Sequence, residues 1–92
     1  MMNALKEYLE ELEEMLKKRS VKALDEFTNK HRLIFGEKYL IDYEVMTHDE
    51  KLDIICRLIL SSGRTTANDI EWAINTQRAI AKRKLKKLGM IK

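Results

Sequence analysis

Cationic side chains gather near the C-terminus at a spacing that would place them on one side of a helix. From Thr76 to Lys92 the chain has seven Lys or Arg residues and no Asp or Glu. Arg78, Lys82 and Lys86 recur every four residues, which aligns side chains along one helical face. The residues that flank this row are Gln77, Arg83 and Lys87. Ammonium and guanidinium groups bind phosphates, and Arg and Gln also form paired hydrogen bonds with base edges.

The charge of the chain is divided between its two parts. Residues 1–63 hold 10 Lys or Arg and 13 Asp or Glu, a net charge of −3, whereas residues 64–92 hold 8 and 2, a net charge of +6. The total of +3 hides this division. A lysine-rich face can simply be solvated, but such faces usually carry glutamates among the lysines. A surface of one sign instead indicates a polyanion partner, and we expect double-stranded DNA.

Among the polar residues of this region, some are predicted to contact bases and others to contact phosphates. Gln77 and Arg78 lie nearest the start of the predicted contact helix, where side chains usually reach the bases. The predicted phosphate contacts are Lys82, Arg83, Lys86 and Lys87, which position a protein without specifying sequence. Three hydroxyls at predicted helix starts are expected to donate to phosphates: Thr65, Thr66 and Thr76.

A helix-turn-helix is predicted to hold these side chains. Thr65 or Thr66 caps a short helix 67–74, Asn75-Thr76 has turn-and-cap chemistry, and a second helix runs over 77–88 until Gly89 ends it. This order of short helix, turn and longer basic helix is the arrangement that places one helix in the major groove. The apolar residues expected to face inward are Ile70, Ala73, Ile74, Ile80, Ala81, Leu85 and Leu88.

The preceding residues predict further helices and one short strand. Helices are expected at about 3–18, with Asn3 as N-cap, at 20–35, and after a Thr47–Glu50 capping box through the apolar run 52–60. Residues 38–45 alternate in polarity, which favours a short strand or an extended linker; a strand would need a partner such as Met90–Ile91 or the same segment of a second subunit. The fold class is therefore mostly α, with about five helices, in a single domain over 1–92.

The end of the basic helix resembles a known family. The stretch Leu85-Lys-Lys-Leu-Gly-Met-Ile91 resembles the Leu-x-x-Leu-Gly-Leu-Ile ending that is common after the recognition helices of winged-helix proteins. The resemblance covers residues 47–92 and implies helices at 51–61, 66–74 and 77–88, the last being the recognition helix. It also implies DNA binding and transcription regulation. The chain stops at Lys92, where a family member would begin its wing, so we expect the wing to be absent or replaced.

A homodimer is expected, because one helix contacts only a few base pairs and paired half-sites raise affinity and specificity. Residues 1–46 are the predicted dimerisation region, through a stripe formed by Leu5, Leu9, Leu12 and Leu16. The alternative is a protein–protein interaction module, such as an inhibitor or accessory subunit of a nucleic-acid-processing complex. RNA binding is a third possibility, although the chain lacks the usual aromatic stacking platform.

Other classes of function find little support in the sequence. There is no catalytic triad, phosphate loop or metalloprotease motif, so we expect no enzyme, no cofactor and no small-molecule substrate. His31 and His48 have no further ligand at metal spacing, and Cys56 is the only cysteine, expected to be a buried hydrophobe. No apolar stretch is long enough to span a membrane and no signal peptide is evident, so the expected location is the cytoplasm.

Overall fold

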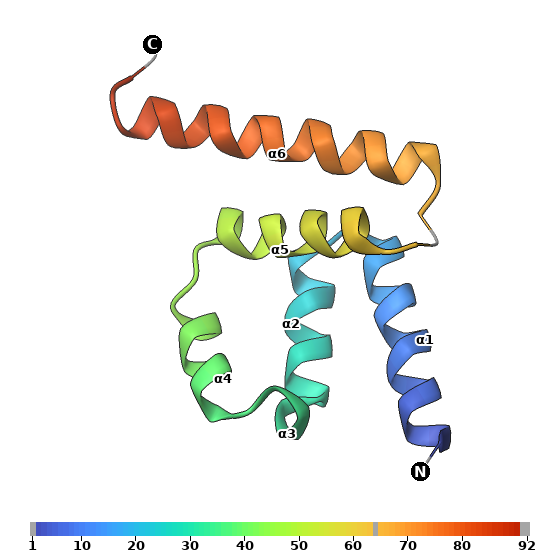
Figure 1. The fold of residues 1–92 in the computed structure, drawn as a ribbon. Helices are drawn as coiled ribbons and strands as arrows, with labels where there is room; N and C mark the ends of the chain where they lie inside the picture. Colours follow the sequence, from blue (N-terminus) through green and yellow to red (C-terminus); the bar gives the residue numbers. More distant parts are fainter. Residues whose placement is uncertain (1, 64, 91–92) are drawn as a thin grey trace.

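The computed structural model describes residues 2–63 and 65–90, with the side chains of 4–63 and 65–90. Within these ranges the secondary structure is helical, with no strand, in six helices (Figure 1). Their bounds are α1 Met2–Lys18, α2 Val21–Lys30, α3 Arg32–Phe35, α4 Glu37–Glu44, α5 His48–Ser61 and α6 Ala67–Lys87. The mostly α prediction is confirmed, and the predicted fold differs from the observed one at three places.

Helix α5 is the centre of the molecule, with α6 along one side and α1 and α2 against the other (Figure 1). It begins as predicted, since Thr47 accepts from the Glu50 amide and the Glu50 carboxylate accepts from the Thr47 amide. Ile55, Cys56 and Ile59 are buried, the first two completely. The capping box provides hydrogen-bond acceptors and donors at the helix start, and the apolar run packs against α1, α2 and α6.

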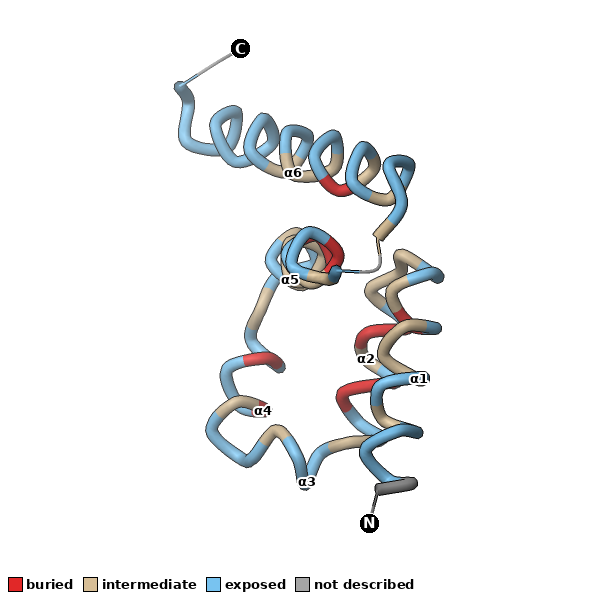
Figure 2. Tube along the Cα trace, turned by 45° about the vertical axis from the view of Figure 1, so that its right-hand side comes forward, coloured by how far each residue is buried: buried red, intermediate tan, exposed pale blue. Residues whose placement is uncertain are grey.

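Helices α1 and α2 form a hairpin whose apolar sides meet α5. Met15, Leu24 and Phe27 are buried in the common core. Figure 2 shows the buried residues on the facing sides of α1, α2, α4 and α5, with a single one on α6. The predicted cap Asn3 lies inside α1, which begins at Met2, and its side chain lies outside the described residues.

The strand predicted at 38–45 is wrong, because these residues form helix α4. Leu40 and Tyr43, three residues apart, are buried, whereas Ile41 and Val45 from the predicted strand face are 57% and 79% exposed. Tyr39 and Tyr43 continue a series of ring contacts from Phe35, with centroids 4.9 and 6.1 Å apart. No other described segment offers a strand to pair with, so the local polarity alternation is overridden by aromatic packing.

The helix predicted over 20–35 is divided at His31, which ends α2 and precedes α3. Its backbone, at φ −110° and ψ 33°, leaves the helical region while its Nε2 lies 2.6 Å from a Glu11 carboxylate oxygen. The ring also stands edge-on to Tyr8 at 5.0 Å. The contacts with α1 thus hold His31 where the chain turns, and Ile34 beyond it is 62% exposed.

The turn predicted at Asn75-Thr76 is also wrong, because α6 continues through it for 21 residues. Asn and Thr each cost a helix well under about 1 kcal/mol relative to Ala, whereas Gly or Pro would cost more. The continuous series of backbone hydrogen bonds outweighs this small loss of helix propensity. Thr76 is also half-buried against its neighbours. The helix-turn-helix and the winged-helix order of 66–74 followed by 77–88 are therefore not formed in the described residues.

The long α6 gives the molecule an extended shape. The radius of gyration is 14.8 Å, against about 12 Å for a compact domain of this length. The last turns of α6 extend past the beginning of α5 (Figure 1). Within the described residues, no helix combines the length and apolar character that crossing a membrane requires.

Candidate nucleic-acid interface

Helix α6 carries the candidate interface, and its start is fixed by local hydrogen bonds. The Thr66 hydroxyl accepts from the Asp69 amide and donates to the Asp69 carboxylate, which also accepts from the Thr66 amide. Ala73 is fully buried against α5, and its small side chain allows close approach of the two helices. These contacts anchor the first half of α6. The second half continues from it along α5 and past the beginning of that helix (Figure 1).

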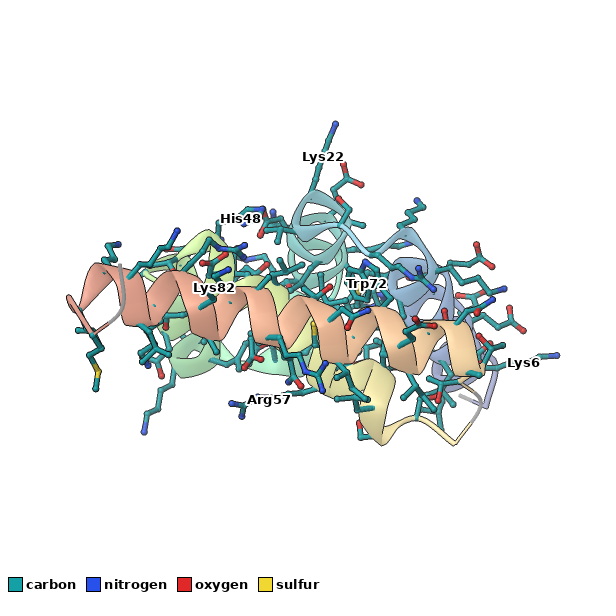
Figure 3. The ribbon with its side chains drawn as sticks, turned by 90° about the horizontal axis from the view of Figure 1, so that it is seen from above. Lys6, Lys22, His48, Arg57, Trp72 and Lys82 are labelled. Atoms are coloured by element: carbon teal, nitrogen blue, oxygen red, sulfur yellow. The ribbon has the colours of Figure 1, made fainter. Side chains whose placement is uncertain are left out.

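The row formed by Arg78, Lys82 and Lys86, here called the cationic row, lies on the exposed side of α6. All three side chains are exposed, as is every residue over 81–90. The row follows helical spacing on the side opposite buried Ala73 and spans about 12 Å along the axis. In the described part of the chain none of the three forms an ion pair. Figure 3 views α6 from its outer side, with Lys82 labelled there.

Gln77 and Arg83 are instead held by carboxylates of α5. The Gln77 amide donates to Asp53 at 3.1 Å, and Arg83 donates to both oxygens of Asp49 at 2.9 and 2.7 Å. The hydrogen bonds from Arg83 lower the pKa of the Asp49 carboxyl and raise the pKa of the guanidinium. Neither side chain is free to contact DNA unless it leaves its α5 partner.

Lys87, predicted to bind phosphate, lines a groove of mixed charge between α5 and α6. Lys84 and Arg83 line the same groove, and Asp49, Glu50 and Asp53 face them from α5. These opposite charges offset one another near the surface. Lys87 therefore contributes less net positive potential than a lysine of the cationic row.

Two of the three threonines predicted to contact phosphates form hydrogen bonds within the chain, and the third lies inside α6. Thr65 donates from its hydroxyl to the Ser62 carbonyl at 3.2 Å, and Thr66 caps α6. Thr76 lies in the middle of α6 and lines a depression with Trp72 and Arg19. None of these hydroxyls stands at an open helix start of the kind that binds phosphate.

The contact that fixes α6 to the junction of α1 and α2 was not predicted from the sequence. Arg19, in the left-handed region at φ 50°, forms an ion pair with Asp69 and places its guanidinium 5.1 Å from the Trp72 ring. The hydrogen bond from Arg19 lowers the pKa of the Asp69 carboxyl. Trp72 itself packs against the core.

The leucine stripe predicted for dimerisation is divided by the fold. Leu12 and Leu16 are half-buried and pack against the core of their own chain. Leu5 and Leu9 remain 61% and 48% exposed. Two leucines on two successive turns form a much smaller apolar surface than the four that the spacing predicted.

Elsewhere in the described residues, the titratable side chains form neither a metal site nor a reactive thiol. There is no group of three or more His, Cys, Asp or Glu side chains that could hold a metal ion. Cys56 is fully buried, and burial raises the pKa of its thiol to about 11, which keeps it protonated and unreactive near neutral pH.

Comparisons of the chain with protein-family models, with curated proteins and with solved structures gave no match. The resemblance of 85–91 to winged-helix proteins therefore remains a prediction from the sequence. Function has to be argued from α6 itself.

Proposed function

We propose that the protein binds double-stranded DNA through the cationic row of α6 and acts as a sequence-specific transcriptional regulator. The observation that carries the proposal is the row itself, three exposed cations on the outer side of a 21-residue helix that form no ion pair with any residue the structure describes. Leaving such charges unpaired along one face is favourable where a polyanion covers them, because binding releases its condensed counterions.

The dimensions of α6 suit the major groove. A helix with its side chains is about 10–12 Å wide, close to the groove width of about 12 Å. In this arrangement the outer side of α6 enters the groove while α5 stays behind it. Arg78 is the candidate for a bidentate contact with guanine, and Lys82 and Lys86 reach the phosphates on the groove edge.

A duplex titration with matched variants tests the proposal. Replacing Lys82 and Lys86 with alanine removes two charges from the row, and replacing Lys6 and Lys38 removes two exposed charges from α1 and α4. We expect the first pair to weaken duplex binding by tenfold or more at low salt and the second pair to change it little. The log–log salt slope should be roughly −2 for the two phosphate contacts and move toward zero in the first variant.

Two results would contradict the proposal. One is the absence of duplex binding at low salt by the unaltered chain. The other is equal weakening by both pairs of substitutions, which would mean that net charge rather than the cationic row causes the attraction.

A second candidate function is a protein–protein interaction module, and the exposed apolar side chains that follow α6 favour it. Leu88, the C-cap of the helix, and Met90, just beyond it, are 64% and 69% exposed. Binding through such groups depends weakly on salt, whereas binding to DNA depends strongly on it. The salt series of the titration therefore also separates the two candidates.

A further inference from the structure

One side of α6 is apolar and uncovered, next to the cationic row. It was predicted to face inward, yet Ile70 and Ile74 are each 39% exposed and Leu85 is 38% exposed. Ala67 and Ala81 lie on the same side and are also exposed. At about 100° per residue, these five side chains fall within roughly 60° of one another. We call them the apolar stripe.

Two residues of opposite charge lie along one edge of the apolar stripe, on either side of its midpoint. Glu71 and Arg78 lie on the same edge, seven residues apart, with Ile74 between them. Both are exposed, and within the described residues neither has an ion-pair partner. Their symmetry about Ile74 means that a second α6, running in the opposite direction, would place each carboxylate beside the guanidinium of the other copy.

We propose that the apolar stripe is a homodimer interface in which two α6 helices pack antiparallel about a two-fold axis near Ile74. The two copies then form two reciprocal Glu71–Arg78 ion pairs. Ile70 and Ile74 lie closest to the axis, and the small Ala67 and Ala81 allow the helices to approach at both ends of the contact. A symmetric interface of this kind closes after two copies.

The neighbouring charge on α5 is compatible with this contact. Arg57 lies beside α6, on the opposite side from His48 and Lys22 (Figure 3). Its Nε is 2.7 Å from Asp53, so it brings its own counterion to the interface. Helix α2, marked by Lys22, lies on the other side of α6 from Arg57 (Figure 3).

The dimer also deepens the proposed function, on which this step rests. A two-fold axis perpendicular to the pair keeps both cationic rows on one face of the dimer. At about 1.5 Å per residue the two Lys86 side chains are separated by roughly 35 Å along the helices. Half-sites one turn apart on B-DNA are separated by about 34–36 Å. The dimer would thus present its two helix ends, with Lys82 and Lys86, to successive major grooves, while Arg78 pairs with Glu71 of the other copy and does not contact guanine.

Charge exchange tests the interface in sedimentation experiments without DNA. We expect the unaltered chain to dimerise, and Glu71→Arg or Arg78→Glu alone to weaken the dimer at least tenfold. The double exchange should restore dimerisation to within about threefold, since the reciprocal pairs form again with reversed sign. Glu10→Arg and Lys38→Glu, exposed residues of α1 and α4, are controls expected to have little effect. Circular dichroism verifies that every variant is folded.

Cross-linking distinguishes this interface from pairing through α1. With a short bismaleimide, Ile74→Cys should give covalent dimers and Leu9→Cys should not, while buried Cys56 gives no background. A chain that is monomeric at about 100 μM, cross-linking at Leu9 alone, or a double exchange that fails to restore the dimer would overturn the proposal. Dimerisation without duplex binding would instead refute the proposed function and leave the interface standing.

Discussion

Helices α5 and α6 lie against each other but are held in different ways. Helix α5 buries three side chains in 14 residues, and contacts both α6 and the α1–α2 hairpin. Helix α6 buries only Ala73 in 21 residues, and two ion pairs, Arg83 with Asp49 and Arg19 with Asp69, add to its packing against α5 and the core. The difference indicates that α5 maintains the fold and α6 presents a surface.

Replacing one isoleucine in each helix with alanine should give the largest difference between them in the loss of unfolding free energy. Ile55→Ala removes a fully buried side chain of α5 and should lower the free energy of unfolding by about 3 kcal/mol. Ile74→Ala on α6, 39% exposed, should cost less than about 1 kcal/mol. Urea unfolding of the monomeric chain measures both. Equal losses would mean that α6 is as integral to the core as α5.

Removing the acid that holds Arg83 should change binding more than stability. Asp49→Asn leaves the size of the side chain unchanged and releases the guanidinium from its bidentate pair. We expect duplex affinity to rise about two- to fivefold and the salt slope to steepen by roughly 0.9, the contribution of one further phosphate contact. Asp42→Asn, an exposed acid of α4, is the control. Unchanged affinity in the Asp49 variant would show that Arg83 takes no part in binding.

Mild acid should loosen α6 before it unfolds the core. The carboxyls of Asp49 and Asp69 have pKa values lowered below the ordinary 3.8, chiefly by hydrogen bonds from Arg83 and Arg19. Their contribution to stability is therefore present above pH 3.8 and is lost as the pH falls through the lowered values. We expect the protection factors of the α6 amides to fall below pH 3.8 while those of α5 are maintained. Simultaneous exchange of both helices would contradict this order.

Helix α5 could be predicted from the sequence because its determinants are local. The Thr47–Glu50 box and the apolar run 52–60 lie within the helix they define. Helix α4 could not, because its residues alternate in polarity and only the packing of Leu40 and Tyr43 decides the conformation. The predicted turn at Asn75-Thr76 failed for a related reason, since weak local preferences lost to a continuous backbone.

The candidate site could be predicted in part. The four-residue spacing identified Arg78, Lys82 and Lys86 as one exposed face. The partners of Gln77 and Arg83 could not be found, because Asp53 and Asp49 lie 24 and 34 residues away in the sequence. A basic side chain is recognisable from sequence, but whether its charge is already neutralised depends on the fold.

An NMR titration of the labelled chain with a short DNA duplex tests the central claim most directly. If the outer side of α6 is the contact surface, amide shifts will change along 78–87 and remain constant in α1 and α4. The Lys82 and Lys86 alanine variant will lose those changes under the same conditions. Shift changes that avoid α6, or that gather on α1, would contradict the account.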